Sequence, residues 1–221
     1  MGTITRGLSN NITTGGVILP AGITNSSVSA VTSFANASGG TLILLSTQTA
    51  SSSATISFTT GLDSTYDEYI FKFINIHAQT STSDFTMNLS TDSGSNYNVT
   101  KTTTYFFAFN LENDTSTGFG YRTESDLAQS TAFQPIAHNQ GDDNDGSLSG
   151  YMSLFNPSST TYVKHFMSTV QHMGDTASNF SGNRFMAGYA NTTSAINAIQ
   201  FKMSSGNIDD GIIKLYGVKK S

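Results

Sequence analysis

The chain has 221 residues and a formal net charge of −5, and 11% of its residues are charged, against roughly 25% in an average soluble protein. Cysteine is absent, which excludes disulfides, thiol nucleophiles and thiolate metal sites. The net negative charge argues against binding to the phosphates of nucleic acids. No segment reaches the roughly 18 consecutive apolar residues of a membrane span, so we expect neither nucleic acid nor membrane as a partner.

Residues 1–40 are small, polar and nearly uncharged, with Arg6 as the only ionisable side chain. Their apolar residues follow neither the strand nor the helix period, and alone they bury too little surface to offset their ordering entropy. No apolar segment follows a basic start, so we expect no secretory signal. We interpret residues 1–40 as an extended N-terminal arm that attaches the protein to a neighbouring chain. An arm lying across its own domain is the alternative.

From residue 41 onward, short segments rich in β-branched and aromatic residues alternate with turn-forming segments. The segments predicted as strands are 41–48, 54–60, 67–77, 84–90, 102–110, 147–155, 161–171, 184–190, 196–204 and 212–218. One stretch, 125–129, fits a helical turn. The pattern predicts an all-β domain over residues 41–221, an antiparallel jelly-roll-like β-sandwich.

The loop from Gly141 to Gly146 is the best metal-site candidate in the sequence. Asp142, Asp143 and Asp145 offer the clustered carboxylate oxygens that calcium prefers. An EF-hand register fails, because with Gly146 in the glycine place the closing ligand is a methionine. An irregular calcium site and a solvated turn between two strands remain as alternatives, and the turn is the simpler one.

No catalytic constellation stands out. The four histidines lie in separate segments without metalloprotease spacing, and no Gly-x-Ser-x-Gly nucleophile elbow occurs. His165 and His172, seven residues apart on one predicted strand, should point to opposite faces. Glutamate occurs only at positions 68, 112 and 124, and Glu68 at a strand start and Glu112 in a turn fit solvated acids. We therefore expect a protein that is not an enzyme and needs no cofactor.

Carbohydrate binding is a rival interpretation, since jelly rolls occur in lectins. Exposed aromatic rings stack on sugars and amides bind their hydroxyl groups, but tryptophan is absent here. Tyr97, Tyr121 and Tyr151 lie nearest to predicted loops and are the glycan-facing candidates, with packing as the alternative role for each.

The abundance of Ser, Thr and Asn, which fill roughly 80 positions, suits contacts made by neutral hydrogen bonds. Such contacts lose little side-chain entropy on formation and are insensitive to salt. Uncharged strand edges risk aggregation unless they are covered. A symmetric homo-oligomer, a trimer or a dimer, is one way to cover them.

Several segments resemble a recurrent domain of structural proteins from marine tailed bacteriophages, of the cyanophage type. The matching segments are 5–16, 44–54, 63–77, 94–105, 126–131, 154–158, 201–208 and 215–217. The resemblance covers nearly the whole chain. It implies membership of a virion and no defined catalytic residues.

The expected function is that of a non-enzymatic virion structural protein, made in the host cytoplasm and displayed on the particle exterior. A capsid decoration or cement protein, anchored by residues 1–40, is the first expectation, because the chain is short and lacks the repetitive shaft of a fibre. Its partners are then the major capsid protein or tail components. The alternative is a tail fibre or fibre-adaptor protein whose β-sandwich binds a host glycan or receptor.

Overall fold

The computed structural model describes residues 12–13, 16–17, 41–174 and 179–220, and the chain divides into two units, Met1–Gly39 and Gly40–Ser221. In the first unit, β1 (Ile12–Thr13) pairs antiparallel with β2 (Gly16–Val17). The rest of the expected arm lies outside the described residues, so its attachment role stays a prediction.

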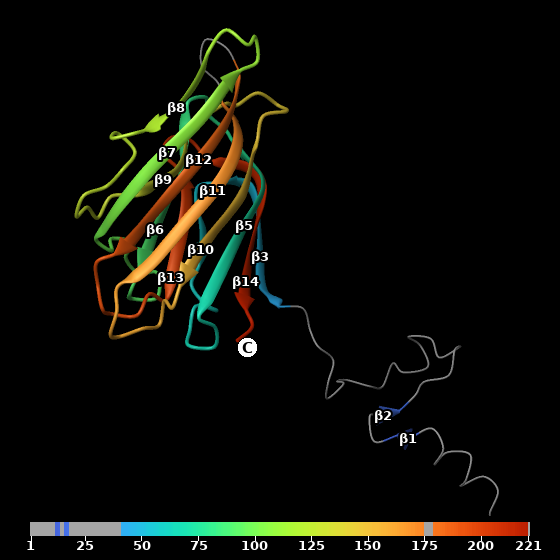
Figure 1. Ribbon diagram of the computed structural model, residues 1–221, viewed down its shortest axis with the longest axis vertical. Coiled ribbons are helices and arrows are strands. Elements are labelled where there is room, and N and C mark those ends of the chain that lie inside the picture. Colours follow the sequence, from blue (N-terminus) through green and yellow to red (C-terminus); the bar gives the residue numbers. More distant parts are fainter. Residues whose placement is uncertain (1–11, 14–15, 18–40, 175–178, 221) are drawn as a thin grey trace, which may run out of the picture. The chain divides into compact units, whose positions relative to one another are not determined.

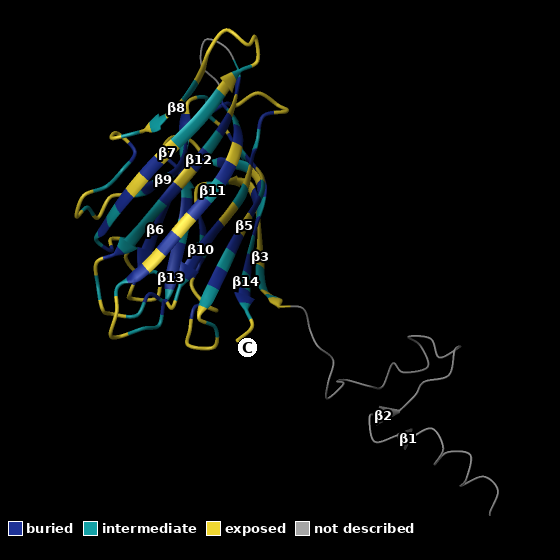
Figure 2. Cartoon of the chain, in the orientation of Figure 1, coloured by how far each residue is buried: buried dark blue, intermediate teal, exposed yellow. Residues whose placement is uncertain are grey.

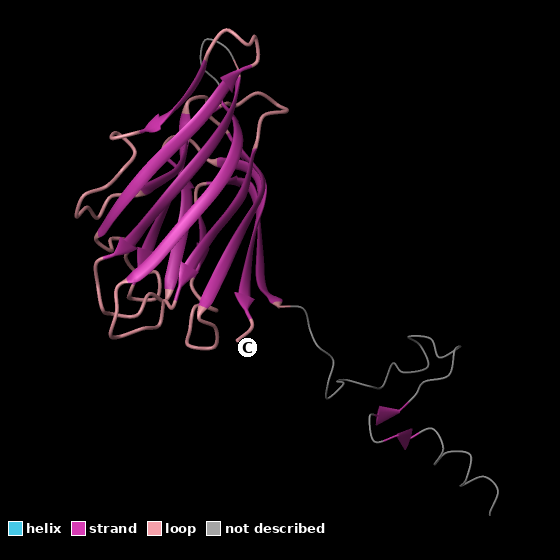
Figure 3. Ribbon diagram, viewed as in Figure 1, coloured by secondary structure: helices cyan, strands magenta, loops and turns pink. Residues whose placement is uncertain are grey.

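Twelve strands form the described part of the second unit (Figure 1). They are β3 (Leu42–Ser53), β4 (Ile56–Phe58), β5 (Glu68–Ala78), β6 (Ser83–Ser90), β7 (Lys101–Leu111), β8 (Thr117–Tyr121), β9 (Gln134–Gln140), β10 (Leu148–Phe155), β11 (Lys164–Gly174), β12 (Phe180–Ala190), β13 (Ala198–Met203) and β14 (Ile208–Val218). No helix occurs among these described residues (Figure 3), and none long and apolar enough to cross a membrane was found there.

Eight of the strands follow the order of a jelly roll. One antiparallel sheet is β3-β14-β5-β10, and the other is β4-β13-β6-β9. Along the chain, every connection between these eight strands crosses from one sheet to the other, except the step from β6 to its neighbour β9. Two four-stranded layers joined in this way are the jelly-roll architecture. The predicted all-β, jelly-roll-like fold is confirmed.

Two hairpins inserted into this framework widen the first sheet. β7 and β8 come between β6 and β9 in the sequence, and β11 and β12 come between β10 and β13. In space these strands continue the sheet in the order β10-β11-β12-β7-β8. Gly174 on β11 also pairs with Gln140 on β9. The widened sheet therefore curls back toward the smaller one and nearly closes a barrel.

The jelly-roll half has an apolar core of interlocking aromatic rings. The centroid of the Phe201 ring lies 5.4 Å from those of Phe71 and Phe73 and 5.8 Å from that of Phe85. Phe58 on β4 reaches the same cluster. Edge-to-face and offset contacts at these distances are the favoured arrangements of aromatic pairs. Figure 2 shows the alternation of buried and exposed positions along the strands that produces this core.

Three local expectations were wrong. Residues 125–129 form no helical turn, and Gln129 has a positive φ of 49°. The short strands β8 and β9 were not predicted. Two glycines flank Phe119 in β8, and β9 contains Pro135 and several polar residues, which are features that argue against a strand.

Candidate functional site

The outer surface of the inserted strands carries a row of large side chains. Tyr121, Phe106, Phe185, Thr169 and Tyr151 occupy opposite positions on β8, β7, β12, β11 and β10. Side chains at directly opposite positions share one face of a sheet and contact each other. The sheet register therefore builds this row from segments that are distant in the sequence.

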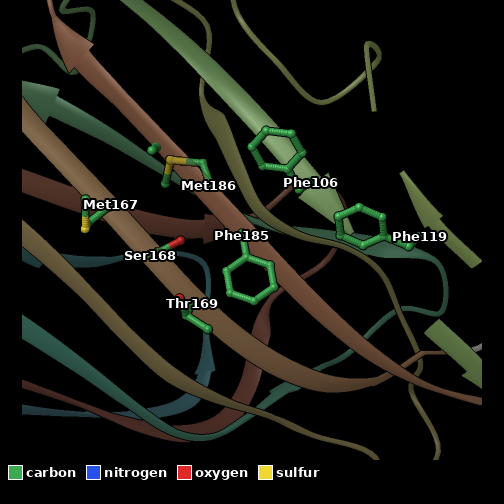
Figure 4. Close-up of a pocket in the computed structure, with 8 residues that line it drawn as sticks. Phe106, Phe119, Met167, Ser168, Thr169, Phe185 and Met186 are labelled. Atoms are coloured by element: carbon green, nitrogen blue, oxygen red, sulfur yellow. The ribbon is translucent and has the colours of Figure 1, made fainter. Parts of the chain in front are cut away.

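Phe119 and Met167 enlarge the row into a patch, which we call the aromatic face and define as Phe106, Phe119, Tyr121, Tyr151, Met167 and Phe185. Every member is exposed, from 41% for Phe106 to 78% for Phe119. The side chains of Phe106, Phe119 and Phe185 surround a hollow of about 480 Å³, with Met167 on its other side (Figure 4).

The hollow of the aromatic face has no charged side chain in its lining. Ser168 and Thr169 are the only polar residues among those that line it. Contiguous exposed apolar patches of this kind mark sites that contact other proteins, membranes or ligands. The patch is also rigid, because it stands on paired strands rather than on loops, and the ring of Phe106 packs edge-to-face on Tyr121 at 5.4 Å.

No protein-family model, curated protein or solved structure matches the chain.

Two of the three predicted glycan-facing tyrosines lie on the aromatic face. Tyr121 and Tyr151 are 44% and 49% exposed, and four strand spacings of about 4.8 Å place their strands roughly 19 Å apart. The hydroxyl of Tyr121 donates to the carboxylate of Asp126, which raises the pKa of Tyr121. Tyr97 is half-buried in the loop after β6, where its carbonyl accepts from Asn88, and it does not join them.

The calcium candidates Asp142, Asp143 and Asp145 are exposed in the loop between β9 and β10. The carbonyl of Asp143 lies 3.0 Å from Nε2 of His77, and its carboxylate accepts from Asn179 at 3.1 Å. Across residues 41–174 and 179–220, no group of three or more His, Cys, Asp or Glu side chains is arranged to hold a metal ion. The calcium site therefore stays a prediction without geometric support.

The polar interior of the inserted half was not predicted from the sequence. Four charged or titratable side chains are at most 1% exposed, those of Lys101, Lys164, His172 and Arg184. On β11, His165 is exposed and His172 is buried, so the two histidines point to opposite faces, as alternation predicted. The two-residue period of β12 does indicate a buried position for one of these residues. Arg184 is in phase with the buried Phe180 and Met186 on β12, so a position inside the barrel follows from the two-residue repeat.

The two buried lysines are accommodated by carbonyl groups rather than by acids. Nζ of Lys101 donates to Oδ1 of Asn88 at 2.6 Å and to the carbonyl of Val99 at 2.8 Å. Nζ of Lys164 donates to the carbonyl of Thr192 at 3.0 Å. Burial lowers the pKa of Lys101 to about 8 and lowers that of Lys164 as well. Lys101 thus links the start of β7 to β6 and to the loop before β7, and Lys164 links the start of β11 to the loop after β12.

Proposed function

We propose that this protein is a non-enzymatic structural component of a bacteriophage particle, displayed on the particle exterior as a capsid decoration protein. The observation that carries the proposal is the aromatic face, an uncharged apolar surface on a rigid sheet. We propose that it packs against a neighbouring capsid subunit of similarly apolar character. The bacteriophage assignment rests on the sequence resemblance described above.

Two further features support an assembly role. The jelly roll is shared by viral capsid proteins and lectins, although a fold by itself does not specify a function. The domain surface is also poor in charge, with 11% charged residues in the chain. Contacts made by apolar packing and neutral hydrogen bonds persist at high ionic strength, because salt screens only charges.

A tail fibre or adaptor that binds a host glycan is the second candidate. It is favoured by the position of Tyr121 and Tyr151 on the same exposed face, since sugar rings stack on accessible aromatic side chains. A glycan array with the isolated second unit separates the two candidates. A selective signal that Tyr121→Ala and Tyr151→Ala remove supports the fibre, and a blank array with intact particle binding supports decoration.

Particle attachment tests the first candidate directly. We expect the double variant Phe119→Ser, Phe185→Ser to fold normally and to lose at least tenfold in affinity for particles that lack the protein. Tyr162→Ser, which alters an aromatic residue that is 71% exposed in a loop away from the aromatic face, is the matched control and should bind like wild type. Cryo-electron microscopy of intact particles then locates the protein on the capsid lattice or at the tail. Absence from both places contradicts the proposal.

A further inference from the structure

A second hollow, open to solvent, lies against the inner surfaces of β7, β12 and β9, on the opposite side of the sheet from the aromatic face. It has a volume of about 260 Å³, room for roughly nine water molecules at about 30 Å³ each. One wall is apolar and the other is cationic and polar. The lining residues are Phe107, Phe109, Leu111 and Phe180 on the apolar side and Arg122, His138, Asn139 and Arg184 on the polar side.

Arg184 is a buried cation without an acidic partner. Its side chain is 1% exposed, and among the described residues no carboxylate lies within ion-pair distance of it. Only Nη1 makes hydrogen bonds, to the carbonyls of Ala108 at 3.2 Å and Asn183 at 3.4 Å, and Nε is buried without a partner. Burial lowers the pKa of Arg184 to about 10, so the guanidinium is charged at neutral pH.

Two neighbouring aromatic rings lie within cation–π distance of the guanidinium. Its central carbon lies 5.7 Å from the centroid of Phe107 and 5.5 Å from that of Phe180. Cation–π contacts of this kind compensate part of the lost hydration, yet they leave the positive charge itself unneutralised. Arg184 is one of the residues that line the hollow, together with the rings of Phe107 and Phe180.

The two histidines beside Arg184 add no further positive charge. Burial and the nearby Arg184 lower the pKa of His138 to about 2 and that of His172 to about 3, so both rings are neutral. Nδ1 of His138 lies 3.3 Å from the hydroxyl of Tyr105. His172 is fully buried, and both of its ring nitrogens lack hydrogen-bond partners.

Among the described residues near the hollow, the carboxylates of Asp84 and Glu124 have partners other than Arg184. The carboxylate of Asp84 accepts from the backbone N–H of Asn139 at 3.0 Å, and burial raises its pKa although Arg122 opposes the shift. Arg122 stands at the rim, where its Nε lies 3.7 Å from the exposed carboxylate of Glu124. Within residues 41–174 and 179–220, the positive charge of Arg184 in the hollow therefore has no acidic partner.

We propose that this hollow binds a small organic carboxylate with an aromatic or other apolar body. The carboxylate lies against the guanidinium of Arg184, whose planar donor fork matches two carboxylate oxygens. The apolar body lies between Phe107, Phe109 and Phe180. Entry runs past Arg122, which attracts an anion without binding it in the interior. The site is independent of the aromatic face and of the function proposed above.

Benzoate is the probe, and benzyl alcohol is its uncharged counterpart of similar shape. We expect benzoate at millimolar concentration to raise the melting temperature of the full chain, because a ligand that binds only the folded state stabilises it, and we expect benzyl alcohol to raise it far less. Isothermal titration calorimetry gives the affinity. Equal effects of the two compounds, or none from either, would overturn the proposal.

Substitutions in and outside the hollow test whether benzoate binds there. Arg184→Met should weaken benzoate binding roughly 10–100-fold, the effect of losing a charge-assisted hydrogen bond, and should melt no lower than wild type, because it removes an unpaired buried charge. Leu111→Trp, which fills the hollow and keeps Arg184, should also abolish binding and serves if Arg184→Met does not fold. Lys202→Met is the control, since this lysine packs on Phe133 at 4.3 Å outside the hollow. Unchanged affinity in Arg184→Met or Leu111→Trp refutes the site.

Discussion

The buried lysine at the start of β7 predicts an unusual dependence of stability on pH. Nζ of Lys101 has two acceptors, Oδ1 of Asn88 and the carbonyl of Val99, and a neutral amine has two hydrogens to offer them. The third proton of the ammonium form gains no partner, and its charge is cut off from water. Burial therefore lowers the pKa of Lys101 from 10.5 to about 8 in the folded protein.

The sign of the effect follows from proton counting. Between pH 8 and 10.5 the unfolded chain binds a proton at Lys101 that the folded chain has released, so stability rises with pH. With these two pKa values, the gain from pH 7.5 to pH 9.5 is about 2 kcal/mol, at 1.36 kcal/mol per unit of pKa difference. For a domain of this size it corresponds to roughly 4–8 °C in melting temperature.

Urea unfolding followed by far-ultraviolet circular dichroism at pH 7.5 and 9.5 measures this gain. At pH 9.5 roughly a quarter of each tyrosine in the unfolded chain is ionised, and wild type and Lys101→Met share this contribution. Lys101→Met should remove most of the pH dependence, whatever its absolute stability, because it keeps the length of the side chain without the titrating group. Lys72→Met, on the exposed outer face of β5, should keep the wild-type dependence. Equal slopes in wild type and Lys101→Met would refute the reasoning.

Two other predictions follow from the packing and the acidic loop. Phe201→Ala should lower the free energy of unfolding by about 3–5 kcal/mol, because its fully buried ring contacts the rings of Phe58, Phe71, Phe73 and Phe85; a loss below about 1 kcal/mol in urea titration contradicts the packing. Calcium and a chelator should leave the melting temperature unchanged, because the described part of the chain holds no suitable cluster of ligands; a calcium-dependent rise that Asp143→Asn removes contradicts this expectation.

The jelly roll was largely predictable from the sequence, because its strands other than β9 are rich in strand-forming residues and are separated by clear turn signals. The alternation at Asn197, Ile199 and Phe201 marks β13, and its buried residues do face the core. The order of the strands was not predictable in detail, since strand pairing depends on contacts between distant segments. The strands that were missed, β8 and β9, have weak local preferences and are formed by their neighbours.

The candidate sites were predictable only in part, and for a physical reason. Tyr121 and Tyr151 were selected because they lie near predicted loops, and both are exposed, although each stands on a strand. The aromatic face itself depends on register, because Phe106 and Phe185 are 79 positions apart and meet only when β7 pairs with β12. Arg184 was not predicted to be buried, because a charged residue is expected to face water, although the two-residue period of β12 places it on the inner face.

The inserted strands use both of their faces, and this separates the two proposals experimentally. On β12, Phe185 points outward to the aromatic face while Arg184 points into the hollow with the anion site. Adjacent residues on a strand point to opposite faces, so a substitution at one position leaves the other surface largely intact. Phe185→Ser should therefore reduce particle attachment without affecting benzoate, and Arg184→Met should do the reverse. If each variant impaired both activities, the inserted hairpins would act as one cooperative unit rather than as two surfaces.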